Sequence, residues 1–262
     1  METEKMLDAE MSRRSLLING GKCVVGVAGI AALVSAVPGL AEAKGTSYEK
    51  FQYKKVNPEE AAKIAYENYF DLWCASTVLK GIFDPLAKNV GGPYKTFPIE
   101  SIRWAHGGYA GWGTLCGTLI GAGNAIGLIT GNIETAEAMT NDLAFYYANT
   151  VMPVYKPAKA IKAEIKTTTK ADTPVCHISV GKWMKAENVA FLTNERAERC
   201  ARVAATIASK TVEMLNAWQA AGGKYTPVNK PLANVLNNGI TSQNNCVECH
   251  GTNVPTPPAA KS

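Results

Sequence analysis

Residues 103–131 read RWAHGGYAGWGTLCGTLIGAGNAIGLITG, and no Asp, Glu, Lys or Arg occurs between Arg103 and Glu134. Glycines recur at every fourth position in two sets, at 113, 117 and 121 and at 123, 127 and 131. Because glycine lowers helix stability, this repetition indicates that another backbone packs very closely here. Asn124 and the many glycines make the stretch a poor membrane span. We therefore predict a buried helix, or two helices broken near Gly121.

Helical patterns lie on both sides of this glycine-rich stretch. Apolar residues at helical spacing predict helices over about 58–83, 135–152 and 195–221. The last residues, 224–262, are rich in Asn, Pro and Gly and predict an extended segment. The predicted fold is mainly α, with a helical body over residues 44–223, a buried glycine-rich helix and an extended C-terminal tail over residues 224–262.

The composition permits a full hydrophobic core and gives no sign of a nucleic-acid partner. The chain has 262 residues, of which 47% are hydrophobic, so one large domain or two small ones can fold. The formal net charge is +5, and the basic residues are dispersed, with no run longer than Lys54-Lys55. We expect no nucleic-acid binding and at most a weak attraction to acidic redox partners.

Residues 1–43 resemble a twin-arginine signal peptide. The segment SRRSLL at 12–17 is followed by an uncharged run at 23–41 and by the cleavage-site pattern Ala41-Glu42-Ala43. We expect the segment to be removed, leaving no permanent membrane anchor and placing the protein in the periplasm. Because this export route carries folded cargo, it also suggests a cofactor inserted before export, usually an iron–sulfur cluster.

The tail contains CVECHG at residues 246–251. Cys-x-x-Cys-His is the attachment signature of a c-type haem. Cys246 and Cys249 would form thioethers with the two vinyl groups, and His250 would be the proximal ligand of the iron. A redox dithiol would need a βαβ context, and a zinc site would need two further ligands at close spacing. Only twelve residues follow His250, so the haem must pack against the helical body of this chain or of a partner.

The sixth haem ligand is left open among few residues. The chain has three histidines, His106, His177 and His250, and a methionine could also ligate the iron. Because methionines at helical positions more often fill the core, a second histidine is the better candidate.

Four further cysteines, Cys74, Cys116, Cys176 and Cys200, lie in the predicted body. In a periplasmic protein they could form two disulfides. Alternatively, four thiolates could bind a cluster or a metal ion. Their wide spacing contains no local motif that decides between the two.

Several segments together resemble the split-Soret cytochrome c family. Residues 104–128 resemble its glycine-rich cysteine segment, and VCHISVGKW at 175–183 resembles its Cys-His-x-Ser stretch. LWC at 72–74 and ERCAR at 198–202 resemble its first and fourth cysteine segments. With CVECHG, the resemblance extends over nearly the whole mature chain.

The resemblance implies a periplasmic homodimer with closely stacked haems and a separate iron–sulfur site. It favours the four body cysteines as ligands of an iron–sulfur cluster, which we expect to be [2Fe–2S]. It also favours His177 as the distal haem ligand, possibly of the partner chain, with His106 in reserve. The family is associated with more than one haem per subunit, whereas this chain has one attachment motif, so we predict one haem c per chain.

The sequence thus favours a periplasmic c-type cytochrome that transfers electrons over an enzyme, with no catalytic residues assigned. The alternative is a haem-dependent reductase or peroxidase, which would need an open sixth position at the iron and an acid–base group above it.

Overall fold

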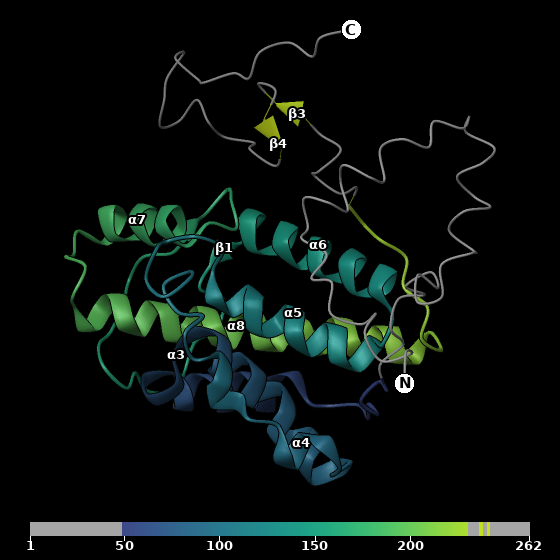
Figure 1. The fold of residues 1–262 in the computed structure, drawn as a ribbon. Coiled ribbons are helices and arrows are strands. Elements are labelled where there is room, and N and C mark those ends of the chain that lie inside the picture. The colour runs from purple at the N-terminus through teal and green to yellow at the C-terminus, as the bar shows by residue number, and fades with distance from the viewer. Residues whose placement is uncertain (1–48, 230–235, 238–239, 242–262) are drawn as a thin grey trace, which may run out of the picture. The chain divides into compact units, whose positions relative to one another are not determined.

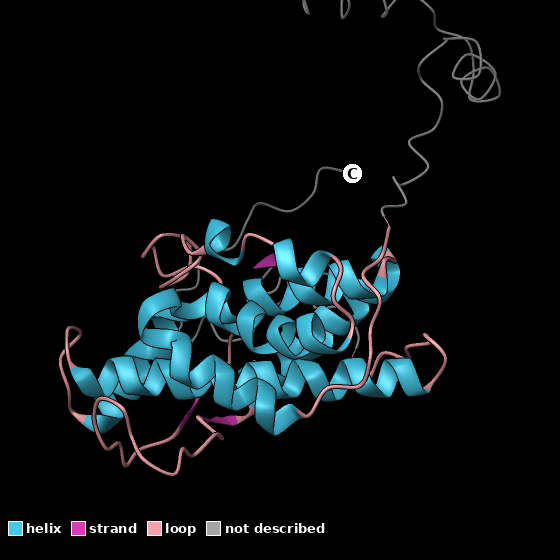
Figure 2. Cartoon of the chain, turned by 90° about the horizontal axis from the view of Figure 1, so that it is seen from below, coloured by secondary structure: helices cyan, strands magenta, loops and turns pink. Residues whose placement is uncertain are grey.

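The computed structural model describes residues 49–229, 236–237 and 240–241, and these residues are mostly helical (Figures 1 and 2). The predicted signal peptide, Cys246, Cys249 and His250 lie outside the described residues. The mainly α fold that the sequence predicts is confirmed.

Helix α3, Pro58–Asn89, begins where the Asn57 side chain accepts a hydrogen bond from the backbone N–H of Glu59. Non-helical torsion angles at Trp73 (φ 63°, ψ −165°) divide it into two helical segments. The sequence prediction that this helix ends at about residue 83 is wrong, because the second segment continues through Pro85 to Asn89. Pro85 is buried there, so packing outweighs its missing backbone donor.

The glycine-rich stretch is helical only in its second half. After the short helices α4, Pro93–Thr96, and η1, Ile99–Ile102, the chain runs through turns before α5, Gly117–Thr130. The prediction of helix across the whole stretch is therefore wrong for residues 103–116. Gly107, Gly108, Gly111 and Gly113 all have positive φ values, which a helix cannot contain.

Gly117 and Gly121 explain why α5 needs glycine. A Cβ atom on Gly117 would overlap the carbonyl oxygen of Ala105 and lie 2.8 Å from the Cβ of Cys74. A Cβ on Gly121 would lie 2.9 Å from the Cα of Ala75. Both glycines let α5 rest directly on the backbone around Cys74, so the close packing predicted from the glycine spacing is confirmed.

The remaining elements complete a small helical bundle. Helix α6, Ile133–Asn149, is capped by Asn132 and leads to strand β1, Val151–Met152, which pairs antiparallel with β2, Thr169–Lys170. Helix α7, Cys176–Glu187, and the long α8, Asn194–Ala220, follow. The short strands β3, Leu236–Asn237, and β4, Ile240–Thr241, pair antiparallel with each other.

Helices α3 and α8 form the central pair, and α5 packs against both of them and against α6 (Figure 1). Buried alanines on the two central helices permit their close approach: Ala61, Ala62 and Ala65 on α3, and Ala201, Ala204, Ala205 and Ala208 on α8. In the part of the chain that the structure describes, no helix combines the length and the hydropathy that a membrane span requires.

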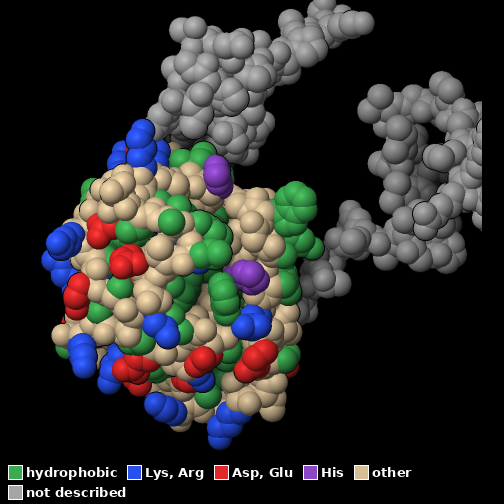
Figure 3. Space-filling model, turned by 90° about the vertical axis from the view of Figure 1, so that its left-hand side faces the viewer, with side chains coloured by type: hydrophobic (Ala, Val, Ile, Leu, Met, Phe, Trp, Pro, Cys, Tyr) green, Lys and Arg blue, Asp and Glu red, His purple; other side chains and the backbone are tan. Residues whose placement is uncertain are grey.

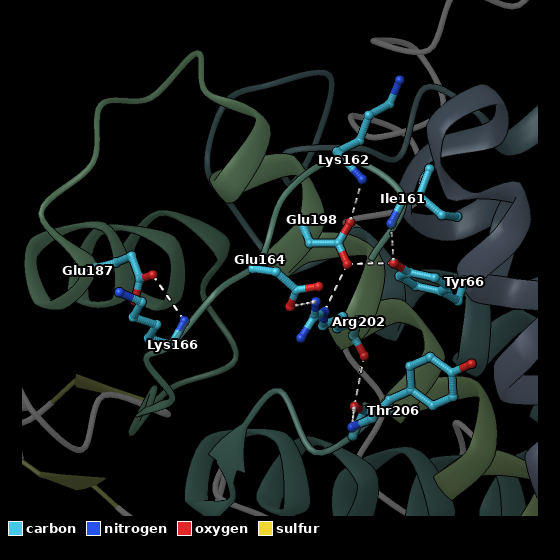
Figure 4. Close-up of polar contacts among 10 residues, drawn as sticks. Tyr66, Ile161, Lys162, Glu164, Lys166, Glu187, Glu198, Arg202 and Thr206 are labelled. Carbon is cyan, nitrogen blue, oxygen red and sulfur yellow. Dashed lines mark hydrogen bonds and ion pairs between the residues drawn. The ribbon is translucent and has the colours of Figure 1, made fainter. Parts of the chain in front are cut away.

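The segment between β1 and β2 is tied to the central helices by Glu198 of α8 (Figure 4). The Glu198 carboxylate is fully buried and accepts hydrogen bonds from the Tyr66 hydroxyl (2.5 Å), the Lys162 backbone N–H (3.1 Å) and Arg202 Nε (2.8 Å). The Tyr66 hydroxyl in turn accepts a hydrogen bond from the backbone N–H of Ile161 (2.9 Å). A long extended segment thus gains a fixed position without regular secondary structure.

Candidate metal centre

Backbone hydrogen bonds bring Cys116 and Cys176 together. Leu115 and Val175 form an antiparallel bridge. The N–H of Cys116 donates to the carbonyl of Pro174 (3.0 Å), and the N–H of Cys176 donates to the carbonyl of Thr114 (2.7 Å). Two cysteines that are sixty residues apart in sequence therefore lie side by side in the fold.

Both of these cysteines stand at helix N-termini. Cys116 is the N-cap of α5, and Cys176 is the first residue of α7. A helix N-terminus stabilises negative charge, so the backbone at each position contributes towards a thiolate. A hydrogen bond from Cys176, aided by Thr118 and Tyr147 and opposed by burial, lowers the pKa of the Cys116 thiol to about 6. The same hydrogen bond, together with burial, raises the pKa of Cys176.

Cys74 is positioned by the break in α3. It directly follows Trp73, whose φ of 63° is rare for a residue with a side chain and costs about 1–3 kcal/mol. The Cys74 sulfur lies 3.7 Å from the Tyr69 hydroxyl, and Gly117 of α5 packs against its Cβ. Burial, followed by the charges of Cys116 and Cys200, raises the pKa of Cys74 to about 12. The strained backbone therefore places a thiol that is neutral when nothing is bound.

Cys200 lies in the second turn of α8, next to the buried Arg199. Arg199 Nη1 is 4.0 Å from the Cys200 sulfur, and Nη2 donates to the Ser179 hydroxyl (2.7 Å) and the Ser179 carbonyl (3.3 Å). Burial lowers the pKa of Arg199, but the charges of Cys200, Tyr147 and Cys116 outweigh burial and raise it. One cationic side chain thus lies among the thiols.

All four cysteines line a single cavity of about 430 Å³. His106 and His177 line it as well, and among the described residues around it there is no Asp or Glu. His106 is half-buried against the Trp73 ring, at 4.9 Å between ring centroids, whereas His177 is exposed. Figure 3 shows histidine side chains beside a hollowed, largely hydrophobic area of this face. The structure therefore brings together all six body residues that the sequence singles out.

The four cysteines are free thiols, each less than 10% exposed. Among the described residues, no three His, Cys, Asp or Glu side chains lie close enough together to hold one metal ion. Four thiols from four separate elements around one cavity are the donor set that iron–sulfur clusters use.

Four residues of the site are assigned no role from the sequence. Trp73 breaks the helix, and Ser179 and Tyr147 form a hydrogen bond (2.8 Å) that meets Arg199 at the Ser179 hydroxyl. Trp73, Ser179 and Arg199 appear only inside segments quoted for the family resemblance, and Tyr147 is not singled out. A charged residue on the apolar face of α8, beside a cysteine, is the signal that could have identified Arg199.

Comparison with known proteins identifies a family. The model of a family described as "Putative redox-active protein (C_GCAxxG_C_C)" matches residues 72–214. That description spells four cysteines, and the matched residues contain four. Cys116 is flanked by Leu115 and Gly117, where the description spells Gly and Ala.

Split-Soret cytochrome c of Desulfovibrio desulfuricans is 29% identical over 255 residues, which cover 92% of this chain and 88% of that protein. The chain is also similar to a solved structure described as showing a novel iron centre in the split-Soret cytochrome c of the same species, with a TM-score of 0.64. The two sequences are 28% identical, and the match covers 82% of this chain and 86% of the chain in the solved structure. The resemblance predicted from the sequence segments is confirmed.

Proposed function

Because the chain belongs to the C_GCAxxG_C_C family, we propose that it is a periplasmic electron-transfer cytochrome with one covalent haem and a separate cysteine-bound iron–sulfur centre. Similarity to split-Soret cytochrome c supports a redox role and haem or iron binding. The observation that carries the proposal is the convergence of four buried free thiols, from four separate elements, on one cavity.

The donor set suits an iron–sulfur centre. Thiolates are the usual ligands of such clusters, and the helix N-termini at Cys116 and Cys176 favour the deprotonated thiols that binding requires. The four thiols of the cavity and the iron centre described for the similar structure support an iron centre at Cys74, Cys116, Cys176 and Cys200, which we propose to be of the [2Fe–2S] type.

The haem would be attached through Cys246 and Cys249, with His250 as the proximal ligand. His177 is exposed on the rim of the cysteine cavity and is free to reach an iron outside the body, in this chain or in a partner. His106 packs against Trp73 and is the reserve ligand. When bound, each group would accept and release one electron, and the chain would set its potential and its access to solvent. The export signal SRRSLL supports a periplasmic location.

The proposal is tested on protein purified anaerobically, by intact mass, iron, acid-labile sulfide and haem content. We expect one covalent haem, together with non-haem iron and sulfide. Cys200→Ser should lose the non-haem iron and sulfide and keep the haem. Cys249→Ala should do the reverse, so each variant is the control for the other. Two disulfides without sulfide would refute the cluster, and an unchanged peptide mass would refute the covalent haem.

The haem ligands and the enzyme alternative are tested together by optical spectroscopy. Bis-histidine ligation predicts a low-spin spectrum that collapses in His177→Ala and survives in His106→Ala. The opposite result would assign the ligand to His106. A five-coordinate, high-spin haem that reacts with peroxide would favour a reductase or peroxidase.

A further inference from the structure

Arg199 is a buried cation without an anionic partner among the side chains around it. It is 2% exposed, and its Nε has no hydrogen-bond partner. Its guanidinium donates to Ser179, which is neutral, and Nη1 lies 4.0 Å from the Cys200 sulfur. No ion pair among the described residues includes it. A guanidinium stays protonated in proteins, so Arg199 keeps its positive charge even though it is buried. An unpaired buried charge is strongly destabilising, so a negative charge close to Arg199 would be expected to offset this cost.

Among the described residues around the cavity, the only candidates for that counter-charge are thiolates. Arg199 Nη1 faces Cys200, and the charges of Cys200 and Cys116 are among those that act on the guanidinium. No described Asp or Glu lines the cavity. Because iron binding requires the thiolate form of each cysteine, the full negative charge is present when all four thiols ligate iron.

We propose that Arg199 is a positioning residue for the iron–sulfur centre. Its buried positive charge balances the negative charge of the cysteine-bound cluster and raises the reduction potential of that cluster. This inference rests on the proposed function. A [2Fe–2S] cluster with four thiolates carries two negative charges when oxidised and three when reduced. A fixed positive charge in a site shielded from water therefore stabilises the reduced form more, and net charge is one of the factors that set cluster potentials.

A hydrogen-bonded chain holds the guanidinium in place. The Ser179 hydroxyl contacts both Tyr147 Oη (2.8 Å) and Arg199 Nη2 (2.7 Å). Tyr147 is fully buried. The chain thus holds the guanidinium from α6 and α7, with Nη1 towards the Cys200 sulfur.

Arg196 provides a matched control on the same helix. It lies one turn before Arg199 and lines the same cavity, but it is only half-buried. Its Nε donates to the carbonyl of Phe191 (2.9 Å), and its guanidinium lies 4.7 Å from the centre of the Phe191 ring. Solvent screens a charge in that position, so its effect on a buried cluster is expected to be much smaller.

The test is a spectroelectrochemical titration of the holoprotein and three variants: Arg199→Met, Arg199→Lys and Arg196→Met. We expect Arg199→Met to lower the reduced-to-oxidised ratio of the cluster at a fixed potential at least tenfold, which is 59 mV for a one-electron couple. Arg199→Lys should retain most of the wild-type potential, and Arg196→Met should change it much less. The haem potential should stay the same in all of them. An Arg199→Met potential equal to that of the wild type would overturn the proposal.

A second measurement separates this role from a merely structural one. After removal of iron under reducing conditions, Arg199→Met should melt at a higher temperature than the wild type, because it lacks an unpaired buried charge. With iron bound, the order should reverse. A variant that is less stable in both states would show a structural role and overturn the proposal. If Arg199→Met does not fold, Ser179→Ala should still lower the potential by disturbing the guanidinium, and an unchanged potential there would count against it.

Iron-free wild-type protein would refute the proposed function itself. In contrast, a wild type that holds iron and sulfide, with an Arg199→Met variant of unchanged potential, would refute only the role of Arg199. The two failures are therefore distinguishable.

Discussion

Glu198 shows how much of the fold depends on one side chain. Its carboxylate has no exposed surface, and it bonds to α3 through Tyr66, to the extended segment through Lys162 and to its own helix through Arg202. A buried carboxylate is tolerated only when its charge is paired and its oxygens are hydrogen-bonded, and Glu198 meets both conditions. Three parts of the chain thus share one anchor.

Glu198→Ala should lower the free energy of unfolding by about 3–5 kcal/mol, because it leaves Arg202 buried with only a distant ion pair to Glu164 (3.6 Å). The measurement is chemical denaturation of the holoprotein. Glu213→Ala is the control on the same helix, since it removes an exposed pair with Lys210 (3.2 Å) worth about 0–1 kcal/mol. Equal losses in the two variants would mean that the buried pair contributes no more to the free energy of unfolding than the exposed pair does.

At the scale of elements, the contact between α5 and α3 determines where Cys74 lies relative to Cys116. Gly121→Ala forces a Cβ against the backbone of Ala75, and we expect it to destabilise the protein by about 1–3 kcal/mol. It should also lower the non-haem iron content, because Ala75 is bonded to Cys74. Thermal unfolding and iron analysis measure the two effects.

Gly123→Ala is the matched control, two residues further along α5. Its Cβ would meet only the Thr140 methyl group, at 3.4 Å, and alanine favours the helix by about 1 kcal/mol. We expect this variant to be as stable as the wild type or more so, with full iron content. A Gly121→Ala variant that behaves in the same way would show that the close backbone contact is dispensable.

The helices could largely be predicted from sequence, because apolar spacing and caps are local signals. The exact ends of the helices could not be predicted from these signals. Pro85 lies inside a helix because tertiary packing compensates for its missing backbone donor. The turns over residues 103–116 depend on positive φ values, which glycine permits but which a glycine in the sequence does not by itself predict. The convergence of the cysteines could not be derived from spacing. It depends on the break at Trp73 and on the Leu115–Val175 bridge, which are tertiary features.

At the scale of the whole molecule, Asp142 of α6 fixes the point where the tail leaves the body. Its carboxylate accepts hydrogen bonds from Tyr225 Oη (2.7 Å), the backbone N–H of Val228 (2.8 Å) and both the backbone and side-chain N–H groups of Asn229 (2.8 and 2.9 Å). Burial raises the pKa of Asp142, but these hydrogen bonds outweigh it, and the net pKa is lowered. The ionised form therefore stabilises the anchored tail.

Asp142→Asn should be less stable than the wild type at pH 7, by about 1–3 kcal/mol. A carboxyl group whose pKa is depressed on folding contributes stability above its unfolded pKa of about 3.9 and loses it as the pH falls through the folded value. The difference between the two proteins should therefore shrink as the pH falls below about 4. Urea denaturation over a pH series measures it, and a gap that stays constant with pH would mean that the charge is irrelevant.

Assembly is the second question at this scale. The haem proposed for the C-terminal tail would need a covering surface, and a homodimer with two-fold symmetry is the commonest way to supply one. We predict a dimer in light scattering and a split Soret band in the reduced protein, because two closely stacked rings couple their transitions. A monomer with a single symmetric band would contradict the stacking and leave the haem attachment intact.

The spread of the cysteines along the chain has a consequence for the order of events in biogenesis. From Cys74 to Cys116, Cys176 and Cys200 the intervals are 42, 60 and 24 residues, so one shared centre would close three loops at once. Such cross-links restrict the unfolded chain, and each ligand reaches its place only after α3, α5, α7 and α8 have packed. Iron would then bind after folding, and bound iron would indicate that the whole body between Cys74 and Cys200 is correctly folded.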